Sequence, residues 1–494
     1  MRIAIRVDAS EKLGTGHFMR CLTLADALFA RGATVTFLSA HMPDLLQGVA
    51  IKAGHGVLTW PDTAWTIPEA GSEWSIAGQD ADADATLAHD DGGGWIVCDH
   101  YGLGRRWEQR IRAAGRRVLA IDDLGRGHDC DILLDQNFYA DPSARYPGDA
   151  ADSVLVGPKF ALLKPAFAQA RAECSLRKDL RRLHLCMGGA DPKNTTAVML
   201  DAIELAGLRA LPTDIVIGAL HPAGGAIAAR CKSNPAWTLH VQTERMADLL
   251  AAADLAIGAG GTATWERCVL GVPTLAVEIE TNQTTLLAEI SRAGIVYGVQ
   301  GKFDAARIAK HLAALVDNPA LRAQISANAF AVTDGAGATR VANLMSGEAV
   351  RIREASLANS ANLHAWRNAP SVRAVSRMTA PIELEAHERW LRQTLDAPDR
   401  WLLIGSRAGH DVGVVRFDLV APTQVEVSIY TTADAAPGDG TPLLLAAEAW
   451  LRGHVHAAET IRAVVMAGNA RSGGLFARAG YTAVSEAFEK KVRP

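Results

Sequence analysis

The histidine at position 17 stands in a glycine-rich stretch, GTGHFMR at residues 14–20, whose composition suits both anion binding and proton transfer. Gly14 and Gly16 let the backbone turn tightly and let a ligand approach closely. The N–H groups at the start of the predicted helix, and the positive end of its dipole, favour an anion and a neutral imidazole. A neutral His17 can act as a general base near neutral pH. The same turn also fits a simple loop with a capping histidine.

A second glycine-rich stretch, GAGGTATWE at residues 258–266, has the composition of a phosphate-binding turn. It follows an apolar run that predicts a buried strand, and a predicted helix begins within it. Glycine N–H groups can face a phosphate there, threonine hydroxyls can add donors, and the carboxylate of Glu266 can bind ribose hydroxyls. The alternative is an ordinary strand–turn–helix in which the glycines serve packing. The candidate residues of this site are Gly260, Gly261, Thr262, Thr264, Glu266, Asn282 and Gln283.

The two stretches belong to two successive runs of alternating strands and helices. Such alternation predicts a parallel sheet covered by helices, and therefore two Rossmann-like α/β domains. We place them at residues 1–150 and 151–345, with a proline- and glycine-rich linker at 138–157. Ligands of such sheets bind outside the carboxyl ends of the strands, so we expect a cleft between the domains. The predicted strands are residues 2–7, 34–38, 95–99, 118–122 and 132–134 in the first domain, and 183–187, 215–217, 239–241, 255–257 and 274–277 in the second.

The pattern changes near residues 345–349, where a third domain is predicted to begin. Residues 401–430 have the composition of three antiparallel strands, followed by a helix at 442–453 and a further strand at 461–466. Strands gathered together between helices predict an α+β domain over residues 350–494. The predicted fold class is therefore two α/β domains followed by an α+β domain.

Composition argues against several classes of function. Hydrophobic residues make up 49% of the chain and charged residues 21%, and the net charge is −4, so neither nucleic acid nor a membrane is an expected partner. No apolar run is long enough to span a bilayer. The seven cysteines are scattered and form no C-x-x-C pair, which favours reduced thiols in the cytoplasm and argues against a zinc site. We expect a monomer with a small-molecule substrate.

Six stretches, occurring in order, carry a resemblance to a known family. They include GTGHFMR at 14–20, CDHYGL at 98–103, MGGADPKN at 187–194 and GAGGTATWE at 258–266. Over about residues 1–340 the chain resembles the UDP-sugar hydrolase of pseudaminic acid biosynthesis, a family with the two-domain glycosyltransferase-B fold. The resemblance implies release of UDP from UDP-2,4-diacetamido-2,4,6-trideoxy-β-L-altropyranose, and it implies no metal.

The resemblance also implies roles for individual residues. His17 is the proposed base, and Tyr101 lies near the sugar. Asp99 stands at a strand end, where it could orient its neighbours His100 or Tyr101 or serve as a cap. The substrate-binding residues implied outside the second glycine-rich stretch are Gly14, Gly16, Arg20, Asp99, Gly188 and Gly189.

The tail resembles a GCN5-related N-acetyltransferase domain. WRNAPSVR at 366–373 and EAHERWL at 385–391 are similar to the variant that acetylates the 4-amino group of a nucleotide-linked amino sugar. The resemblance implies acetyl-CoA as the cofactor, with its pyrophosphate on a turn before a helix. One departure is Phe476, because many relatives have a tyrosine general acid there; Tyr481 or Tyr430 could replace it, or the thiolate could leave unassisted. The implied cofactor-binding residues are Gly438, Gly440, Thr441 and Asn469, and Glu426 is the candidate base.

Three functions remain open for the whole chain. The first is a hydrolase with a fused acetyltransferase, the second a glycosyltransferase of the same fold, and the third a non-catalytic sugar-nucleotide-binding module. A glycosyltransferase needs an acceptor groove, often flanked by basic or apolar membrane-facing segments, and no such segment is evident. The presence of both His17 and Tyr101 argues against the third. The Asp122–Asp123 pair could bind a metal, yet the motif that it matches is structural in the resembled family.

Overall fold

The computed structural model describes residues 1–10, 15–60, 72–146, 151–174, 177, 179–189, 191–219, 221–280, 283–346, 350–376, 378–407, 409–433, 435, 439–455, 458–466, 469–484 and 487–491. The candidates Gly14, Asn282 and Gly438 lie outside these residues. The chain divides into two compact units, Met1–Ala342 and Asn343–Pro494. Among the described residues, no helix combines the length and the apolar character needed to cross a bilayer.

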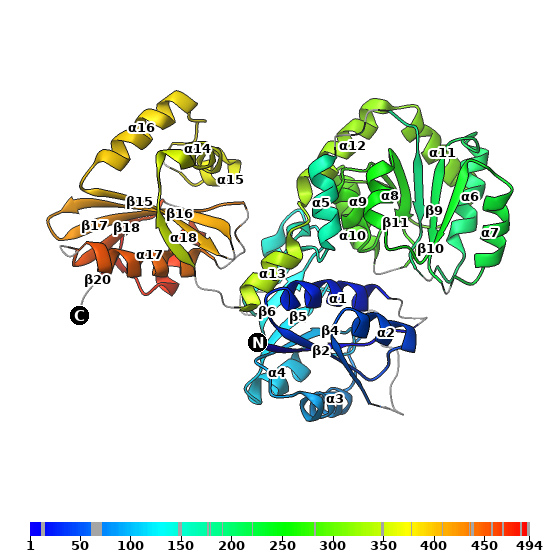
Figure 1. Cartoon of the computed structure of the whole chain (residues 1–494), viewed down its shortest axis with the longest axis horizontal. Coiled ribbons are helices and arrows are strands. Elements are labelled where there is room, and N and C mark those ends of the chain that lie inside the picture. The colour runs from blue at the N-terminus through cyan, green and yellow to red at the C-terminus, as the bar shows by residue number, and fades with distance from the viewer. Residues whose placement is uncertain are drawn as a thin grey trace. The chain divides into compact units, whose positions relative to one another are not determined.

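The first sheet of the larger unit consists of seven parallel strands. They are β1 (Arg2–Val7), β2 (Thr34–Ser39), β3 (Gly56–Thr59), β4 (Trp95–Asp99), β5 (Arg117–Ile121), β6 (Cys130–Asp135) and β7 (Ala151–Val156), with helices α1 (Gly16–Phe29), α2 (Asp44–Lys52), α3 (Ile76–His89) and α4 (Arg105–Ala113). Their order is β3-β2-β1-β4-β5-β6-β7, so the chain starts in the middle and winds outward in both directions. Figure 1 shows α1 and α2 on one face of the sheet and α3 and α4 on the other.

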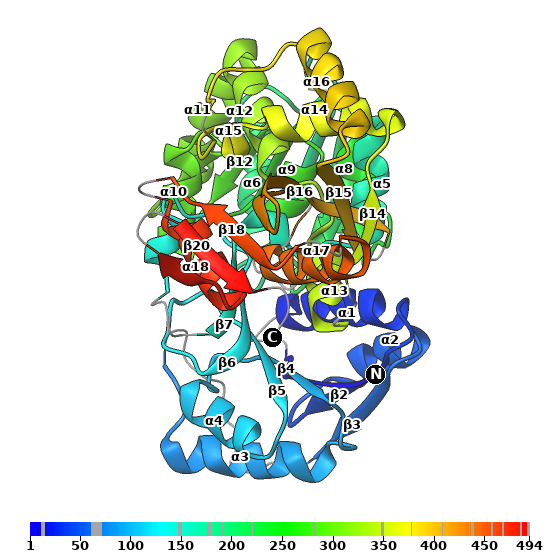
Figure 2. The same cartoon turned by 90° about the vertical axis from the view of Figure 1, so that its left-hand side faces the viewer.

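The first domain ends later in the chain than the sequence predicts, because β7 belongs to its sheet. The prolines and glycines of residues 138–157 favour a linker, but Ala151–Val156 pairs in parallel with β6, and Leu134 lies opposite Leu155. Leu155 is fully buried, and Figure 2 shows β5, β6 and β7 side by side. The first domain therefore extends past residue 150, because the strand at the edge of its sheet is hidden among turn-forming residues.

The second sheet of the larger unit consists of six parallel strands. The elements are α5 (Pro165–Glu173), β8 (Leu183–Cys186), α6 (Thr195–Leu205), β9 (Thr213–Ile217), α7 (Gly224–Lys232), β10 (Trp237–Val241), α8 (Met246–Ala252), β11 (Leu255–Ala259), α9 (Thr264–Val269), β12 (Thr274–Val277), α10 (Thr284–Arg292), β13 (Tyr297–Val299), α11 (Ala305–Val316), α12 (Pro319–Val332) and α13 (Gly337–Ser346). The strand order in this sheet is β10-β9-β8-β11-β12-β13. Every residue of β11 is buried, as expected for a central strand covered on both faces.

The smaller unit is built on a sheet of mixed direction. Its elements are β14 (Arg351–Glu354), α14 (Ser360–Asn368), α15 (Pro370–Arg373), α16 (Leu384–Asp396), β15 (Arg400–Arg407), β16 (His410–Ala421), β17 (Gln424–Thr431), α17 (Gly440–His454), β18 (Thr460–Val464), α18 (Ala470–Arg478), β19 (Thr482–Val484) and β20 (Ala487–Lys491). The order is β14-β15-β16-β17-β18-β20-β19. Neighbours are antiparallel except β17 and β18, which run parallel and whose pairing ends at Val427 and Ala463.

The helices of the smaller unit pack on this mixed sheet through buried apolar side chains. Leu443, Leu444 and Ala447 of α17 join one buried cluster with residues of β16 and β17. Leu363 of α14 and Leu391 of α16 join another with β15 and β16.

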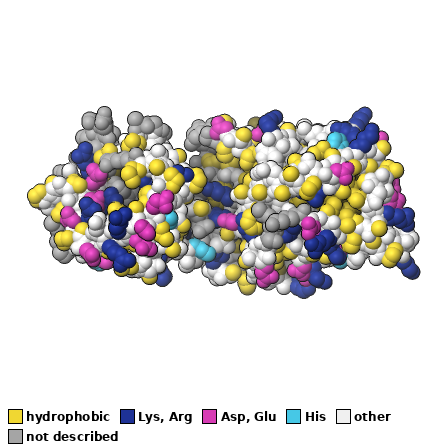
Figure 3. Space-filling model, turned by 90° about the horizontal axis from the view of Figure 1, so that it is seen from above, with side chains coloured by type: hydrophobic (Ala, Val, Ile, Leu, Met, Phe, Trp, Pro, Cys, Tyr) yellow, Lys and Arg dark blue, Asp and Glu magenta, His cyan; other side chains and the backbone are white. Residues whose placement is uncertain are grey.

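On the visible face of each unit, basic and acidic side chains are interspersed (Figure 3). The predicted fold class is confirmed: two Rossmann-like α/β domains precede an α+β domain.

Candidate active site

His17 is paired with Asp99 in the larger unit. His17 lies in the first turn of α1, and Asp99 is the last residue of β4. Nδ1 of His17 and Oδ1 of Asp99 are 2.6 Å apart; the His17 side chain is 16% exposed and that of Asp99 is 1% exposed. Because a carboxylate accepts, His17 donates its Nδ1 proton, and Nε2 keeps a lone pair for an incoming proton.

Arg20 holds Asp99 in its ionised form. Its Nε donates to Asp99 Oδ2 at 2.6 Å and its Nη2 donates to Oδ1 at 2.7 Å, a two-point contact that matches carboxylate geometry. Burial opposes ionisation of Asp99, but Arg20 and His17 together hold its pKa well below the usual range. The sequence suggested His100 or Tyr101 as partners of Asp99; in the structure, its carboxylate contacts the side chains of His17, Arg20 and Cys21.

Tyr101 is held at both ends beside His17. The two rings meet edge to face, with centroids 4.8 Å apart. The Tyr101 hydroxyl donates to Asp123 Oδ2 at 3.4 Å, and Nη1 of Arg126 donates to the Tyr101 carbonyl at 2.5 Å. The structure therefore brings together the two residues predicted to serve as base and sugar contact.

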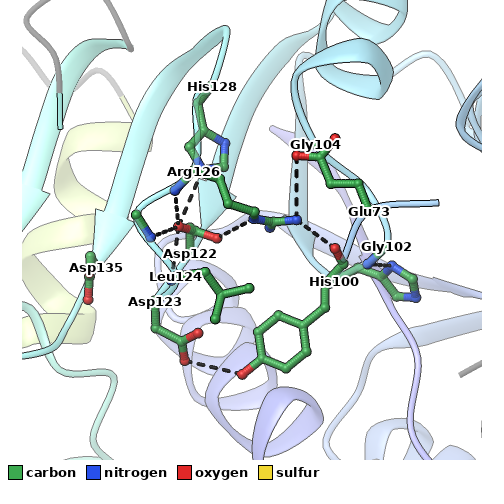
Figure 4. A network of polar contacts seen from close by, with 12 residues as sticks. Glu73, His100, Gly102, Gly104, Asp122, Asp123, Leu124, Arg126, His128 and Asp135 are labelled. Atoms are coloured by element: carbon green, nitrogen blue, oxygen red, sulfur yellow. Dashed lines mark hydrogen bonds and ion pairs between the residues drawn. The ribbon is translucent and has the colours of Figure 1, made fainter. Parts of the chain in front are cut away.

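Asp122 and Asp123 point in different directions, which bears on the metal alternative (Figure 4). Asp122 accepts from Nε of Arg126 at 2.8 Å and lies 3.5 Å from Nε2 of His128. Asp123 points away from both, toward Tyr101. The two carboxylates thus serve separate contacts and do not converge on one point.

One buried group has the residue types of a metal site, namely Glu108, His128 and Cys130. Nδ1 of His128 and Oε1 of Glu108 are 2.6 Å apart, and the other Glu108 oxygen accepts from the Asp129 N–H at 2.6 Å. Burial lowers the pKa of His128, but Asp122 and Glu108 outweigh it and raise that pKa to about 9. These contacts are those of an internal ion pair.

The glycine turn of the second domain lies between β11 and α9. Gly261 and Thr262 are partly exposed, and a Cβ atom on Gly261 would lie 3.4 Å from Nε2 of Gln283. The predicted partners Gly261 and Gln283 are therefore neighbours. Thr264, by contrast, is fully buried, and its Oγ1 accepts from Nη2 of Arg267 at 3.0 Å. Its hydroxyl therefore contacts Arg267 inside the protein and is not exposed on the turn.

Glu266 is a partly buried carboxyl group on α9. Burial raises the pKa of Glu266 to about 7, while the charges of Arg267 and Lys164 oppose that rise. Among the described residues, none acts on Glu266 through a hydrogen bond. Its oxygens are therefore open to hydroxyl donors of a ligand.

The loop with Gly188 and Gly189 approaches the start of α1. Gly188 has φ of +109°, a backbone conformation that favours glycine. A Cβ atom on Gly189 would lie 3.5 Å from Oγ1 of Thr15. The N-terminus of α6 is already occupied, since Asp191 accepts from the N–H groups of Thr195 and Thr196 at 2.8 and 2.7 Å. Within this unit, the first glycine loop of the second domain thus lies beside the turn that precedes His17.

The smaller unit contains a cavity of about 490 Å³. Its lining includes the predicted base Glu426 and the predicted cofactor residue Asn469, together with Phe476. Gly440 opens α17, and Oγ1 of Thr441 is buried without a hydrogen-bond partner among the described residues. The cavity lies where β17 and β18 have stopped pairing, because Ser428, Ile429 and Tyr430 line it beyond the last pair.

The two tyrosines that could replace a missing acid have different surroundings. Tyr430 lines the cavity, and burial raises its pKa while Arg367 and Arg416 oppose the rise. Tyr481 is 5% exposed and packs edge to face on Phe476; burial and Glu448 both raise its pKa. Tyr430 is therefore the one of the two whose side chain lines the described cavity.

Taken together, the chain combines two Rossmann-like α/β domains with an α+β domain built on a sheet of mixed direction. Curated relatives include the spore coat polysaccharide biosynthesis protein SpsG of Bacillus subtilis, 30% identical over 168 residues, which are 34% of this chain and 50% of that protein. The UDP-2,4-diacetamido-2,4,6-trideoxy-beta-L-altropyranose hydrolase of Campylobacter jejuni is 31% identical over 197 residues, 39% of this chain and 62% of that protein. The chain thus spans between 50% and 62% of these two relatives.

The solved structures similar to the chain include one that covers most of it and one that covers less than a third. MurG of Acinetobacter baumannii has a TM-score of 0.48 at 14% identity, covering 70% of this chain and 99% of that one. An aminoglycoside acetyltransferase in complex with coenzyme A has a TM-score of 0.27 at 15% identity, covering 29% of this chain and 94% of that one. No protein-family model matches the chain.

Proposed function

We propose that the larger unit is a UDP-sugar hydrolase whose substrate is UDP-2,4-diacetamido-2,4,6-trideoxy-β-L-altropyranose. The observation that carries the activity is the contact of His17 Nδ1 with Asp99, which leaves Nε2 as a base. The substrate is the one in the name of the Campylobacter jejuni relative. The seven free cysteines suit a reducing compartment, so we assign the reaction to the cytoplasm.

In the proposed reaction, water attacks C1 of the sugar. Its proton passes to Nε2 of His17, the C1–O bond to the diphosphate breaks, and UDP leaves with the bonding electrons. Asp99 supports the imidazolium that forms, because its carboxylate remains ionised. Tyr101, held beside the base, is positioned to contact the sugar.

The second domain has the groups to hold UDP. The N–H groups of the turn at Gly260, Gly261 and Thr262 would bind the diphosphate and stabilise its charge as the bond breaks. Glu266 would accept from ribose hydroxyls, and the Gln283 amide adjoins Gly261. This division of labour predicts that the base can be removed without loss of UDP affinity.

We further propose that the tail transfers acetyl from acetyl-CoA to the 4-amino group of the preceding UDP-sugar. The amine nitrogen attacks the thioester carbonyl, the C–S bond breaks, the amine proton passes to Glu426, and the thiolate takes a proton from Tyr430. Both residues line the cavity, which supports these roles. The pairing of β17 with β18 ends at this cavity, and the unpaired part of β17 would leave room for an extended arm of acetyl-CoA.

Incubation with the UDP-sugar and no acceptor tests the hydrolase. Release of UDP together with free sugar supports it. A glycosyltransferase releases UDP in step with a sugar acceptor, and a binding module releases none, so intact UDP-sugar after prolonged incubation overturns the proposal. Mass spectrometry of the 4-amino UDP-sugar with and without acetyl-CoA tests the tail in the same protein, and an unmodified amine would refute that part.

A further inference from the structure

We propose that Arg20 is a positioning residue that joins the base and the sugar-contacting tyrosine into one rigid group and places a positive charge beside the base. This inference rests on the proposed hydrolase function. It assigns Arg20 a different role from the substrate contact that the sequence resemblance implies.

Among the described residues, the side-chain donors to the Asp99 carboxylate all lie on α1, the helix that carries His17. Oδ1 receives His17 Nδ1 at 2.6 Å and Arg20 Nη2 at 2.7 Å, and Oδ2 receives Arg20 Nε at 2.6 Å and the Cys21 thiol at 3.5 Å. The Arg20 side chain is 5% exposed. A guanidinium so enclosed and so fully engaged with a carboxylate is poorly placed to bind a substrate phosphate.

The third guanidinium nitrogen extends the contact to a second carboxylate. Nη1 of Arg20 lies 3.6 Å from Oδ2 of Asp123, the same oxygen that accepts from the Tyr101 hydroxyl at 3.4 Å. The other Asp123 oxygen is buried without a hydrogen-bond partner among the described residues. Arg20 thus links Asp99 at the end of β4 to Asp123, which lies two residues past the end of β5 and accepts from the Tyr101 hydroxyl.

The net charge of His17 and the residues around it depends on whether His17 is protonated. The charged or titratable groups that the described elements bring to His17 are Arg20 on α1, Asp99 on β4, and Tyr101 and Asp123 on the two following loops. With neutral His17 the group carries one net negative charge, and with the imidazolium it is balanced. The negative charge of Asp99 is opposite to that of an imidazolium, whereas the positive charge of Arg20, whose Nη2 lies 3.1 Å from Nδ1, has the same sign.

The test separates the charge of Arg20 from its shape. Arg20→Met removes both, and we expect the acid limb of the kcat/KM pH profile to move up by about one pH unit and kcat to fall about tenfold or more. Arg20→Lys keeps the charge but loses the two-point contact, so kcat should fall while the limb stays near its normal position. Asp123→Asn removes a negative charge, so the acid limb should move to lower pH. Arg106→Met, which breaks the exposed pair with Asp80, is the control and should change neither.

A second readout does not depend on turnover. NMR titration of the His17 ring, assigned with a His17→Gln variant, should show a higher midpoint in Arg20→Met and a lower one in Asp123→Asn. If the wild-type chain releases UDP but neither limb nor midpoint moves, the inference is wrong while the hydrolase stands. If the midpoints move in a chain that releases no UDP, the electrostatic inference holds and the proposed function fails. A thermal-unfolding measurement on each variant shows whether a loss of activity comes from misfolding. If Arg20→Met fails to fold, the results for Arg20→Lys and Asp123→Asn decide whether the inference holds.

Discussion

His17 and Asp99 are 82 positions apart in the sequence, yet Nδ1 and Oδ1 lie 2.6 Å apart. The contact forms because β1 and β4 are neighbours in the sheet, so the helix after β1 begins beside the carboxyl end of β4. Parallel sheets gather their ligand-binding groups at this edge. The pairing fixes which ring nitrogen of His17 is available as a base.

Asp99→Asn should lower turnover by about 10²–10⁴-fold while UDP affinity stays unchanged. The amide cannot hold His17 in the same protonation pattern, and UDP is assigned to the other domain. Steady-state kinetics combined with UDP calorimetry checks this. Near-normal turnover would show that the ring needs no carboxylate.

Glu266→Gln should weaken UDP binding by about 1–3 kcal/mol. Because the pKa of Glu266 is raised to about 7, the carboxyl group is largely protonated below pH 7 and becomes a full acceptor above it. UDP affinity of the wild type should therefore rise as the pH passes through 7, and that rise should be missing in Glu266→Gln. Calorimetry at several pH values would contradict the assignment if the two proteins behaved alike.

Gly261→Ala should lose UDP affinity with little change in folding. A Cβ atom there lies 3.4 Å from the flexible end of Gln283, so the fold tolerates it, but the methyl group occupies the side where a phosphate would approach. Gly225→Ala is a matched control, because a Cβ atom on Gly225 has no neighbour within 4 Å. Equal UDP affinity in the two variants would count against the turn as a phosphate site.

The buried pair of His128 and Glu108 should make stability depend on pH. The pKa of His128 is raised to about 9, so its contribution is fully present below its unfolded value near 6.5 and is lost as pH rises through 9. The shift corresponds to about 3 kcal/mol. Urea unfolding of wild type and His128→Gln should differ more at pH 6 than at pH 10. A difference independent of pH would mean that His128 contributes by packing alone.

Tyr430→Phe should slow acetyl transfer by about tenfold or more, because the variant loses the hydroxyl that we assign to the leaving thiolate. Tyr481→Phe, which removes a hydroxyl outside the cavity, should chiefly affect stability. Acetyl-CoA binding by calorimetry should persist in both. Equal transfer rates in the two variants would favour unassisted departure of the thiolate.

Local patterns predicted the parts of the site that depend on neighbours in sequence. A glycine turn before a helix can be recognised at His17 and at Gly261 because turn and helix start are adjacent in the chain. The strands that carry the site follow from apolar runs of four to six residues in a parallel sheet.

Contacts between distant residues could not be predicted in that way. Arg20 and Asp123 each belong to a motif that the sequence singles out, but the contact between them depends on how β4 and β5 align. The edge strands β7 and β13 were hidden for a different reason: one is surrounded by prolines and glycines, and the other has three residues, too few for a periodic pattern. Thr264 looks like a phosphate donor from its place in the motif, yet packing buries it.

The most direct test of the central claim uses the UDP-sugar in water labelled with heavy oxygen, with no acceptor present. If His17 activates water to attack C1, the label appears in the released sugar and is absent from UDP. His17→Ala should abolish the labelled sugar while leaving UDP affinity intact. Label in UDP would mean attack at phosphorus, and an unchanged UDP-sugar would mean no hydrolysis; either result contradicts a hydrolase in which His17 is the base.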